Sequence, residues 1–113
     1  MAKGVFVDRV MAMCVNATVE DLVLDWPSVV GIHHWHQIAG IDRTSATTRT
    51  EAGVKRGSEF YPYMTAVAPA AGAAVAVAGG IVSPGDYVPC IRFVGATAGD
   101  VLELMVNGEY EPE

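Results

Sequence analysis

The sequence lacks the short motifs that mark common catalytic and nucleotide-binding sites. It has no Gly-x-x-x-x-Gly-Lys phosphate loop, no Gly-x-Gly-x-x-Gly loop and no Gly-x-Ser-x-Gly nucleophile elbow. The pair Gly79-Gly80 lies between Ala/Val segments, where it favours a turn between two strands. No local pattern supports Ser-His-Asp chemistry. These absences give no support for hydrolytic chemistry or nucleotide binding, and we assign no catalytic residues and no cofactor.

Cysteine is also scarce. The two cysteines, Cys14 and Cys90, lie in apolar stretches and form neither a Cys-x-x-Cys pair nor a zinc-binding spacing. We predict that both are buried free thiols. The segment 1–9 is interrupted by Asp8 and Arg9 and lacks the apolar core of a signal peptide, which favours synthesis and folding in the cytosol.

Basic residues are outnumbered by acidic ones. Lys and Arg total 7 against 13 Asp and Glu, so the net charge is −6. This balance argues against binding to the backbone of a nucleic acid. The excess is concentrated in residues 61–113, where Arg92 is the one basic residue. Different faces or ends of the fold are therefore expected to have different surroundings.

Charged residues are absent from positions 60–85. This run exceeds the roughly 20 apolar residues of a membrane span, but Pro62, Pro69 and Pro84 interrupt it. The stretch between the last two prolines is dominated by Ala and Gly, and it is too short and too weakly hydrophobic for stable insertion. We expect no transmembrane helix and no membrane partner.

What the sequence does contain is a series of short apolar segments separated by Gly, Pro and Asp. With 113 residues, 51% of them hydrophobic, the chain fits one domain, 1–113. The tetrads 83–86 and 97–100 and the dipeptide Asn107-Gly108 are typical of turns. We predict an all-β fold, a small sandwich or barrel. The predicted strands are 5–15, 20–26, 28–38, 60–67, 73–78, 87–94 and 101–106. A helix is the alternative for 5–15 and, capped by Thr18, for 20–26.

Alternation assigns the two faces of the last predicted strand. Leu102, Leu104 and Val106 share a face that we expect in the core, whereas Glu103 lies on an opposite, partly solvated face. The segment 5–15 offers apolar residues on both faces, so we predict a strand that is covered on both sides.

A polar segment separates the two halves of the chain. Residues 42–58 contain one aliphatic side chain larger than Ala, and we predict a long polar loop or arm that reaches a partner. Four basic residues lie in it, and they either dock onto an acidic protein surface or belong to a solvated loop. They are Arg43, Arg49, Lys55 and Arg56.

Histidines and aromatic residues form two further candidate sites. On a strand, His34 and His36 project to one face and His33 and Trp35 to the other, so His34 and His36 could share a metal. Two ligands do not complete a site, and we favour a structural or interfacial role for this cluster, with no metal. Three aromatic residues follow the polar segment directly. The sequence allows them either to pack in the core or to form an interface. The residues assigned to the predicted partner interface are Trp35, His36, Arg43, Arg49, Lys55, Arg56, Phe60, Tyr61 and Tyr63.

Two stretches of the C-terminal half resemble one known family. They are residues 73–88 (AAVAVAGGIVSPGDYV) and 95–110 (GATAGDVLELMVNGEY). Over about residues 66–110 the chain resembles the small, acidic head decoration, or cement, proteins of tailed bacteriophages. The resemblance implies a non-enzymatic protein on the capsid surface of a virion, made in the host cytoplasm. It also implies a homo-oligomer, trimer or dimer, that binds the major capsid protein.

Two alternatives remain open at the sequence level. The first is a small β-barrel binding domain or metal-dependent enzyme domain that uses the cluster His33–His36. The second is a tail or adaptor component of the same kind of particle, which would rest on the same physical features as a decoration protein.

Overall fold

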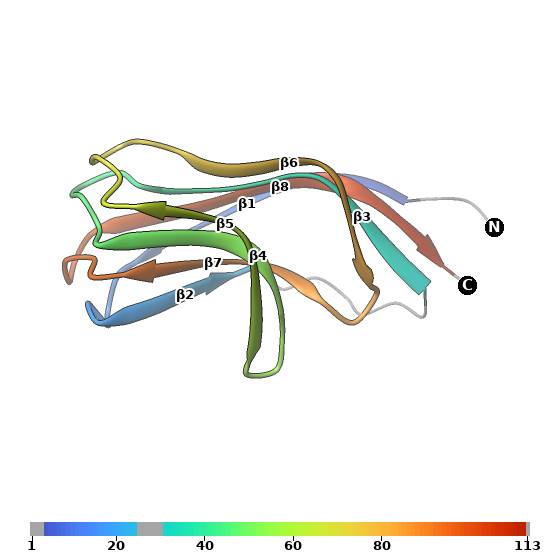
Figure 1. The fold of residues 1–113 in the computed structure, drawn as a ribbon, viewed down its shortest axis with the longest axis horizontal. Coiled ribbons are helices and arrows are strands. Elements are labelled where there is room, and N and C mark those ends of the chain that lie inside the picture. Colours follow the sequence, from blue (N-terminus) through green and yellow to red (C-terminus); the bar gives the residue numbers. More distant parts are fainter. Residues whose placement is uncertain (1–3, 25–30, 113) are drawn as a thin grey trace.

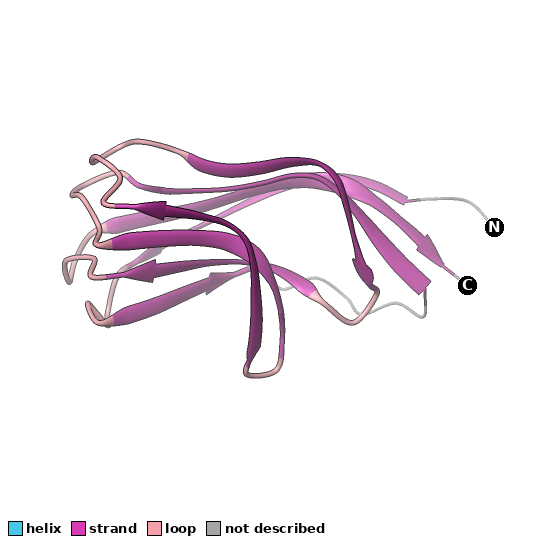
Figure 2. Ribbon diagram, in the orientation of Figure 1, coloured by secondary structure: helices cyan, strands magenta, loops and turns pink. Residues whose placement is uncertain are grey.

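The computed structural model describes residues 4–24 and 31–112, which form β-strands joined by turns and loops (Figures 1 and 2). The predicted all-β fold is confirmed, and the architecture is a sandwich of two sheets. The described residues include no helix long and apolar enough to cross a membrane. The strands are β1 (Gly4–Met13), β2 (Val19–Val23), β3 (Gly31–Asp42), β4 (Arg49–Arg56), β5 (Glu59–Val67), β6 (Val75–Pro84), β7 (Val88–Val94) and β8 (Val101–Pro112).

Each sheet has four antiparallel strands. The order is β1-β8-β3-β6 in the first, here called sheet A, and β2-β7-β4-β5 in the second, sheet B. The strands β5 and β6 are therefore edge strands on the same side of the sandwich, and β1 and β2 are the edge strands on the other (Figure 1). The molecule is elongated, with principal extents of 44 × 24 × 19 Å.

The core is built from alternate residues of the central strands. Leu102, Leu104 and Val106 are fully or almost fully buried on the inner face of β8, as their alternation predicts. They pack in one cluster with Trp35 of β3 and Phe93 of β7. Burying one such leucine contributes about 1.5–3 kcal/mol by area transfer, so this cluster holds the two sheets together.

A β-bulge changes the alternation of β3. Trp35 pairs with Gly108 of β8 and Gln37 pairs with Asn107, so His36 is an extra residue. Gly108 permits this close approach, because a Cβ atom there would lie 2.4 Å from the carbonyl oxygen of His34. The bulge turns both His36 and Gln37 outward and returns Ile38 to the core.

The predicted polar arm at 42–58 is wrong over most of its length. Residues 49–56 form β4, which is paired on both sides, with β5 and with β7. Its inward side chains are buried and small, namely Thr50, Ala52 and Val54. The prediction failed because these inward side chains are small. Thr and Ala can fill the core between the sheets, but they do not give the sequence a strong hydrophobic pattern.

Two predicted turns are also wrong. The strand β8 continues through Asn107 and Gly108 to Pro112, because these residues pair with β1 on one side and with β3 on the other. The strand β6 likewise continues through 79–80, where Gly79 has φ 76° beside the β3 bulge. By contrast, 83–86 and 97–100 do form turns, closed by hydrogen bonds from Tyr87 N to Pro84 O and from Asp100 N to Thr97 O.

The remaining predicted strands correspond to observed ones. The segments 25–26 and 28–30 of two predicted strands lie outside the described residues. Cys14 and Cys90 are buried free thiols, as predicted. Burial raises the pKa of Cys14 above its usual value and that of Cys90 to about 12.

Candidate assembly surfaces

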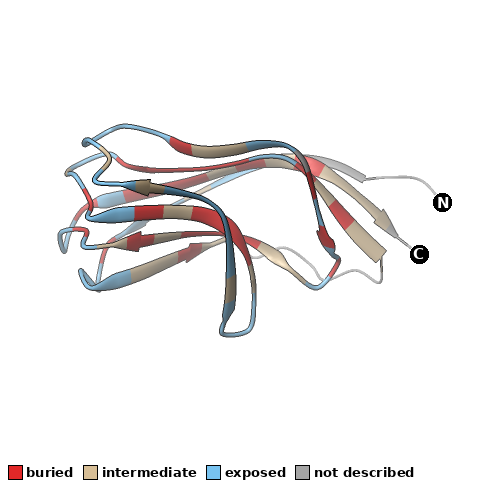
Figure 3. Cartoon of the chain, in the orientation of Figure 1, coloured by how far each residue is buried: buried red, intermediate tan, exposed pale blue. Residues whose placement is uncertain are grey.

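The edge strand β5 is open to solvent on both faces. Its large side chains are about half exposed or more, with 44% for Tyr61, 47% for Tyr63, 43% for Met64 and 79% for Val67. Figure 3 shows β5 largely exposed beside β4, whose middle is buried. No other described strand places an aromatic pair at the surface in this way.

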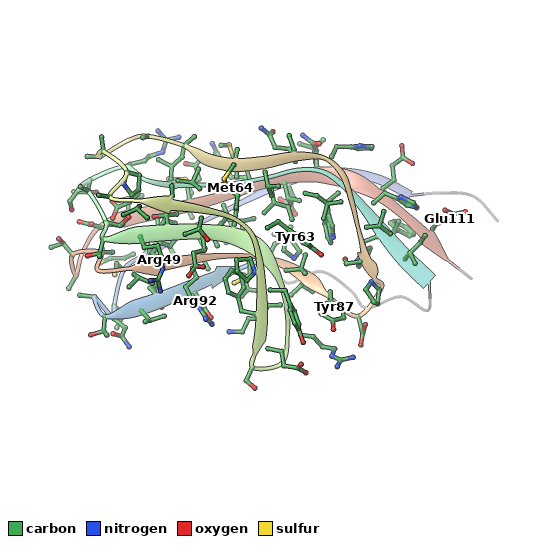
Figure 4. The ribbon with its side chains drawn as sticks, in the orientation of Figure 1. Arg49, Tyr63, Met64, Tyr87, Arg92 and Glu111 are labelled. Atoms are coloured by element: carbon green, nitrogen blue, oxygen red, sulfur yellow. The ribbon has the colours of Figure 1, made fainter. Side chains whose placement is uncertain are left out.

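A hollow opens between β5 and the end of β6. Its volume is about 390 Å³, and we call it the tyrosine hollow; Figure 4 labels Tyr63 and Tyr87, two of its walls. The rings of Tyr61 and Tyr87 lie 5.8 Å apart between centroids. The lining residues are Val54, Tyr61, Pro62, Tyr63, Ser83, Pro84 and Tyr87.

Charged groups fix the walls of the tyrosine hollow. The Tyr61 hydroxyl donates to Glu59 Oε2 at 2.6 Å, and this hydrogen bond raises the pKa of Tyr61 to about 12. The same hydrogen bond lowers the pKa of Glu59, and the contact with Arg56 is the next largest cause of this shift. The Arg56 guanidinium lies 5.1 Å from the Tyr87 ring centroid and 3.3 Å from Asp86. The rings of Tyr61 and Tyr87 are thus oriented by contacts within the chain.

The outer face of sheet B carries a charge network. Asp21 receives two hydrogen bonds from Arg92, at 2.7 and 2.9 Å, and one from Lys55 at 2.7 Å. The Arg92 contact is the main reason that the pKa of Asp21 is lowered. Arg92 also lies 4.6 Å from the ring centroid of Phe60. Phe60 is therefore partly covered by its own chain.

The outer face of sheet A carries a second apolar surface, which we call the methionine face. Val10 of β1 packs toward the core, so its odd-numbered neighbours point outward. They are strongly exposed, at 80% for Val7, 47% for Met11 and 66% for Met13. The prediction that segment 5–15 is covered on both sides is therefore wrong for the single chain. The methionine face consists of Val7, Met11, Met13, Val101 and Met105.

A carboxylate lies beside the methionine face. Glu103, expected to be partly solvated, is only 1% exposed. Arg43 donates two hydrogen bonds to it, at 2.8 and 3.2 Å, and Arg9 approaches to 4.0 Å. The Arg43 contact lowers the pKa of Glu103. The side chains that cover this carboxylate are themselves exposed cations, so it remains a shallow ion pair.

The histidine cluster is divided between the two faces of β3, as its alternation predicts. His33 is buried, its Nδ1 lies 3.1 Å from the Tyr87 carbonyl oxygen, and burial lowers its pKa. His34 and His36 lie on the outer face, next to Glu111 at 3.1 Å and Glu109 at 3.5 Å. Among the described residues, no three metal-ligating side chains come together.

Two carboxyl groups meet at one end of the sandwich. Asp42 Oδ1 accepts hydrogen bonds from the backbone of Thr44 and Ser45, but its buried Oδ2 has no donor. Asp100 accepts from Ser45 Oγ at 2.6 Å and from Thr97 N at 3.1 Å. Burial and the neighbouring Asp100 raise the pKa of Asp42, whereas the pKa of Asp100 is lowered. Of the two carboxyl groups, Asp42 is therefore the more easily protonated, and the hydrogen bonds of both stabilise the turn.

The structure separates the nine predicted interface residues. The prediction for Trp35 is wrong for the folded chain: its side chain is 1% exposed and Nε1 donates to Ser83 Oγ at 2.8 Å. His36 lies in β3 of sheet A, and Arg43 directly follows the end of β3. The other six lie on the β4–β5 hairpin, two of them partly covered; they are Arg49, Lys55, Arg56, Phe60, Tyr61 and Tyr63.

The four predicted basic residues do not form a free positive patch. Each is paired with an acid of the same chain: Arg43 with Glu103, Arg49 with Glu51, Lys55 with Asp21, and Arg56 with Glu59 and Asp86. Figure 4 shows Arg49 and Arg92 on sheet B and Glu111 at the far end of β8. Sequence reasoning missed Tyr87 and the methionine face, whose signal was the surplus of apolar residues on both faces of β1.

The comparisons with known proteins define the fold. No protein-family model and no curated protein matches this chain. Among solved structures, the chain is similar to a protein of Bacillus endospore appendages, which form a family of disulfide-linked pili. The two share 16% sequence identity over 100% of this chain and 93% of the other, with a TM-score of 0.52. At this identity the similarity establishes the fold alone, an all-β sandwich.

Proposed function

We propose that this protein is a non-enzymatic structural protein of a tailed bacteriophage that decorates the head by binding the outer surface of the major capsid protein. The observation that carries the proposal is the exposure of Tyr61 and Tyr63 on an edge strand, beside the tyrosine hollow. Aromatic side chains with fixed orientations are typical of the residues that dominate protein interfaces.

The charge pattern of the β4–β5 hairpin supports contact through apolar and aromatic area. Because Arg49, Lys55 and Arg56 are already paired within the chain, docking through their charges would require breaking existing ion pairs. They fit the polar rim of an interface whose centre is formed by Tyr61 and Tyr63.

Two resemblances support a structural role. The sequence of residues 66–110 resembles capsid cement proteins, and the Bacillus protein of similar fold belongs to pili, which are protein assemblies. Neither resemblance carries a catalytic role. A tail or adaptor position in the same particle would use the same surface, and the experiment below separates it from a head position.

The test is binding of the purified chain to empty shells of the major capsid protein encoded with it. We expect saturable binding, and the double variant Tyr61→Ala/Tyr63→Ala should weaken it by about tenfold or more while the fold is retained. Val82→Ala, which trims a side chain of similar exposure on β6, should leave binding unchanged. Binding of the wild-type chain to isolated tails but not to shells would overturn the head position.

A further inference from the structure

The tyrosine hollow has a lining that is selective as well as exposed. We propose that it binds an extended, proline-rich segment of its partner in the polyproline II conformation. The inference deepens the proposed function and rests on it, because it names the kind of segment that the shell protein presents to Tyr61 and Tyr63. The observations that support it concern the lining of the hollow and the strand edge beside it.

The size and composition of the lining fit such a segment. The volume of about 390 Å³ lies within the range of about 300–1,000 Å³ that is typical of ligand pockets. Three of the seven lining residues are tyrosines, two are prolines, and none of the seven carries a charge. Grooves lined by aromatic rings are the sites at which proline-rich segments dock, since the preformed polyproline II helix loses little entropy on binding.

Two of the aromatic rings are oriented by contacts within the chain. The ring centroids of Tyr61 and Tyr87 lie 5.8 Å apart with the planes tilted by 52°. Glu59 accepts the hydrogen bond of the Tyr61 hydroxyl, and the Arg56 guanidinium lies near the Tyr87 ring. These contacts reduce the side-chain entropy that is lost when a ligand packs against the rings.

The charged groups around the hollow favour a ligand without charge and with few N–H donors. Glu59 accepts hydrogen bonds from Tyr61 and Arg56, and Asp86 accepts one from Arg56. A charged ligand, or one rich in N–H groups, would compete with these contacts. Proline has neither a charge nor a backbone N–H, so a proline-rich segment leaves the contacts intact.

A buried part of the lining can donate a hydrogen bond to the ligand. Ser83 lines the hollow and is only 2% exposed. Its Oγ accepts a hydrogen bond from Trp35 Nε1 at 2.8 Å, and a serine hydroxyl also has one proton to donate. The carbonyl oxygens of a polyproline II segment have no partners within the segment, so one of them can accept this proton.

The edge beside the hollow disfavours a β-strand as the occupant. Pro62 has no backbone N–H, and a register shift between Ala52 and Gly53 interrupts the regularity of β5. A strand added to a sheet needs a regular row of backbone donors and acceptors. A polyproline II segment forms no such ladder, so it can lie beside this interrupted edge.

The test is binding of a synthetic decaproline, acetylated and amidated, to the isolated protein, followed by backbone amide chemical shifts in NMR spectra. We expect saturable shifts at β5, at the end of β6 and at Tyr87. Tyr63→Ala should weaken the binding by about tenfold or more. Met64→Ala changes the next residue of β5 (Figure 4), which has a similar exposure, 43% against 47%, but does not line the hollow, and it should leave binding unchanged.

Two further measurements test the donor and the class of ligand. Ser83→Ala should weaken decaproline binding several-fold; thermal unfolding checks that this variant, which also loses the Trp35 contact, is folded. If it is not, the pair Tyr63→Ala and Met64→Ala decides alone. A capped Gly-Ser peptide of the same length should not bind. The inference is wrong if decaproline gives no saturable shifts, if Tyr63→Ala and Met64→Ala have equal effects, or if maltohexaose shifts these residues and decaproline does not.

Binding to shells separates this inference from the proposed function. Shell binding that depends on Tyr61 and Tyr63, without decaproline binding, would leave the capsid proposal standing and overturn the inference. Decaproline binding by a chain that does not bind shells would support the hollow as a polyproline II site and overturn the capsid proposal. Release of the bound chain from shells by excess decaproline would support both.

Discussion

The methionine face and the tyrosine hollow are both exposed and apolar, but they differ in the backbone beneath them. The methionine face spreads over the edge strand β1 and the inner strand β8, and β8 is paired on both sides, so the part of this surface on β8 offers only side chains. The tyrosine hollow borders an edge strand, β5, whose backbone has one unpaired side. The comparison indicates that a surface spread over a paired strand offers mainly side chains, whereas a surface confined to an edge strand also exposes unpaired backbone groups, which need protection against unwanted pairing.

That protection is visible in β5. Pro62 has no backbone N–H to donate, and a register shift between Ala52 and Gly53 leaves Tyr63 without an opposite residue. Both features interrupt the ladder that an added strand would need. The edge therefore presents the rings of Tyr61 and Tyr63 to a partner instead of a continuous row of hydrogen-bonding groups.

The largest expected effect breaks the support of the methionine face. Leu104→Ala should lower the free energy of unfolding by about 2–5 kcal/mol, because Leu104 is fully buried on the inner side of β8. Urea denaturation of the wild-type and variant chains checks this value. A loss below about 1 kcal/mol would mean that β8 does not carry the core.

The next effect targets the hairpin without touching sheet A. A Cβ atom at Gly53 would lie 2.0 Å from the carbonyl oxygen of Tyr61, so Gly53→Ala must displace β5. We expect a loss of about 1–3 kcal/mol together with weaker shell binding. Gly57→Ala changes the turn of the same hairpin, where no atom lies within 4 Å of the added carbon. It should cost only the strain of its positive φ, and equal effects on shell binding would contradict this account.

A smaller effect concerns the ion pair beside the methionine face. Glu103→Gln should destabilise the chain by about 1 kcal/mol at neutral pH, since Arg43 then loses a charged partner. The lowered pKa of Glu103 means that this contribution is present at neutral pH and is lost as the pH falls through that value. Thermal unfolding of both chains from neutral to acidic pH should therefore converge. If the difference in melting temperature between the two chains stays constant as the pH falls, the stabilisation comes from packing and not from the ion pair.

The smallest effect concerns Asp42. Its raised pKa means that its protonated form stabilises the fold at low pH and that this stabilisation is lost as the pH rises through the raised value. Asp42→Asn keeps the backbone contacts and supplies a permanent donor, so its stability should exceed that of the wild type at neutral pH by less than about 1 kcal/mol. Asp8→Asn, an exposed control, should leave the melting temperature at neutral pH unchanged. A lower melting temperature for Asp42→Asn at neutral pH would contradict the raised pKa of Asp42.

The parts of the fold that could be predicted from sequence are those set by local chemistry. The alternation of Leu102, Leu104 and Val106 and the turn at Asp100 depend on neighbours in the chain, and both are as predicted. The strand β4 was missed because its inward residues are small, and only pairing with β7 and β5 reveals their burial.

Candidate sites were harder to predict for a related physical reason. Asn107-Gly108 satisfies the local rule for a hairpin, yet strands β1 and β3 hold it extended from both sides. Trp35 has the chemistry of an interface residue, but its neighbours bury it. Both faces of β1 carry apolar residues, and this pattern does not say whether its outer face is covered by the same chain or by another. Sequence alone does not distinguish these cases.

The burial of the two thiols limits the covalent chemistry that the folded domain can carry out. The thiolate is the reactive form of cysteine, and a pKa of about 12 leaves almost none of it at Cys90 near neutral pH. Cys14 is buried with a raised pKa as well. In the folded domain neither thiol is therefore poised to form a disulfide with another chain.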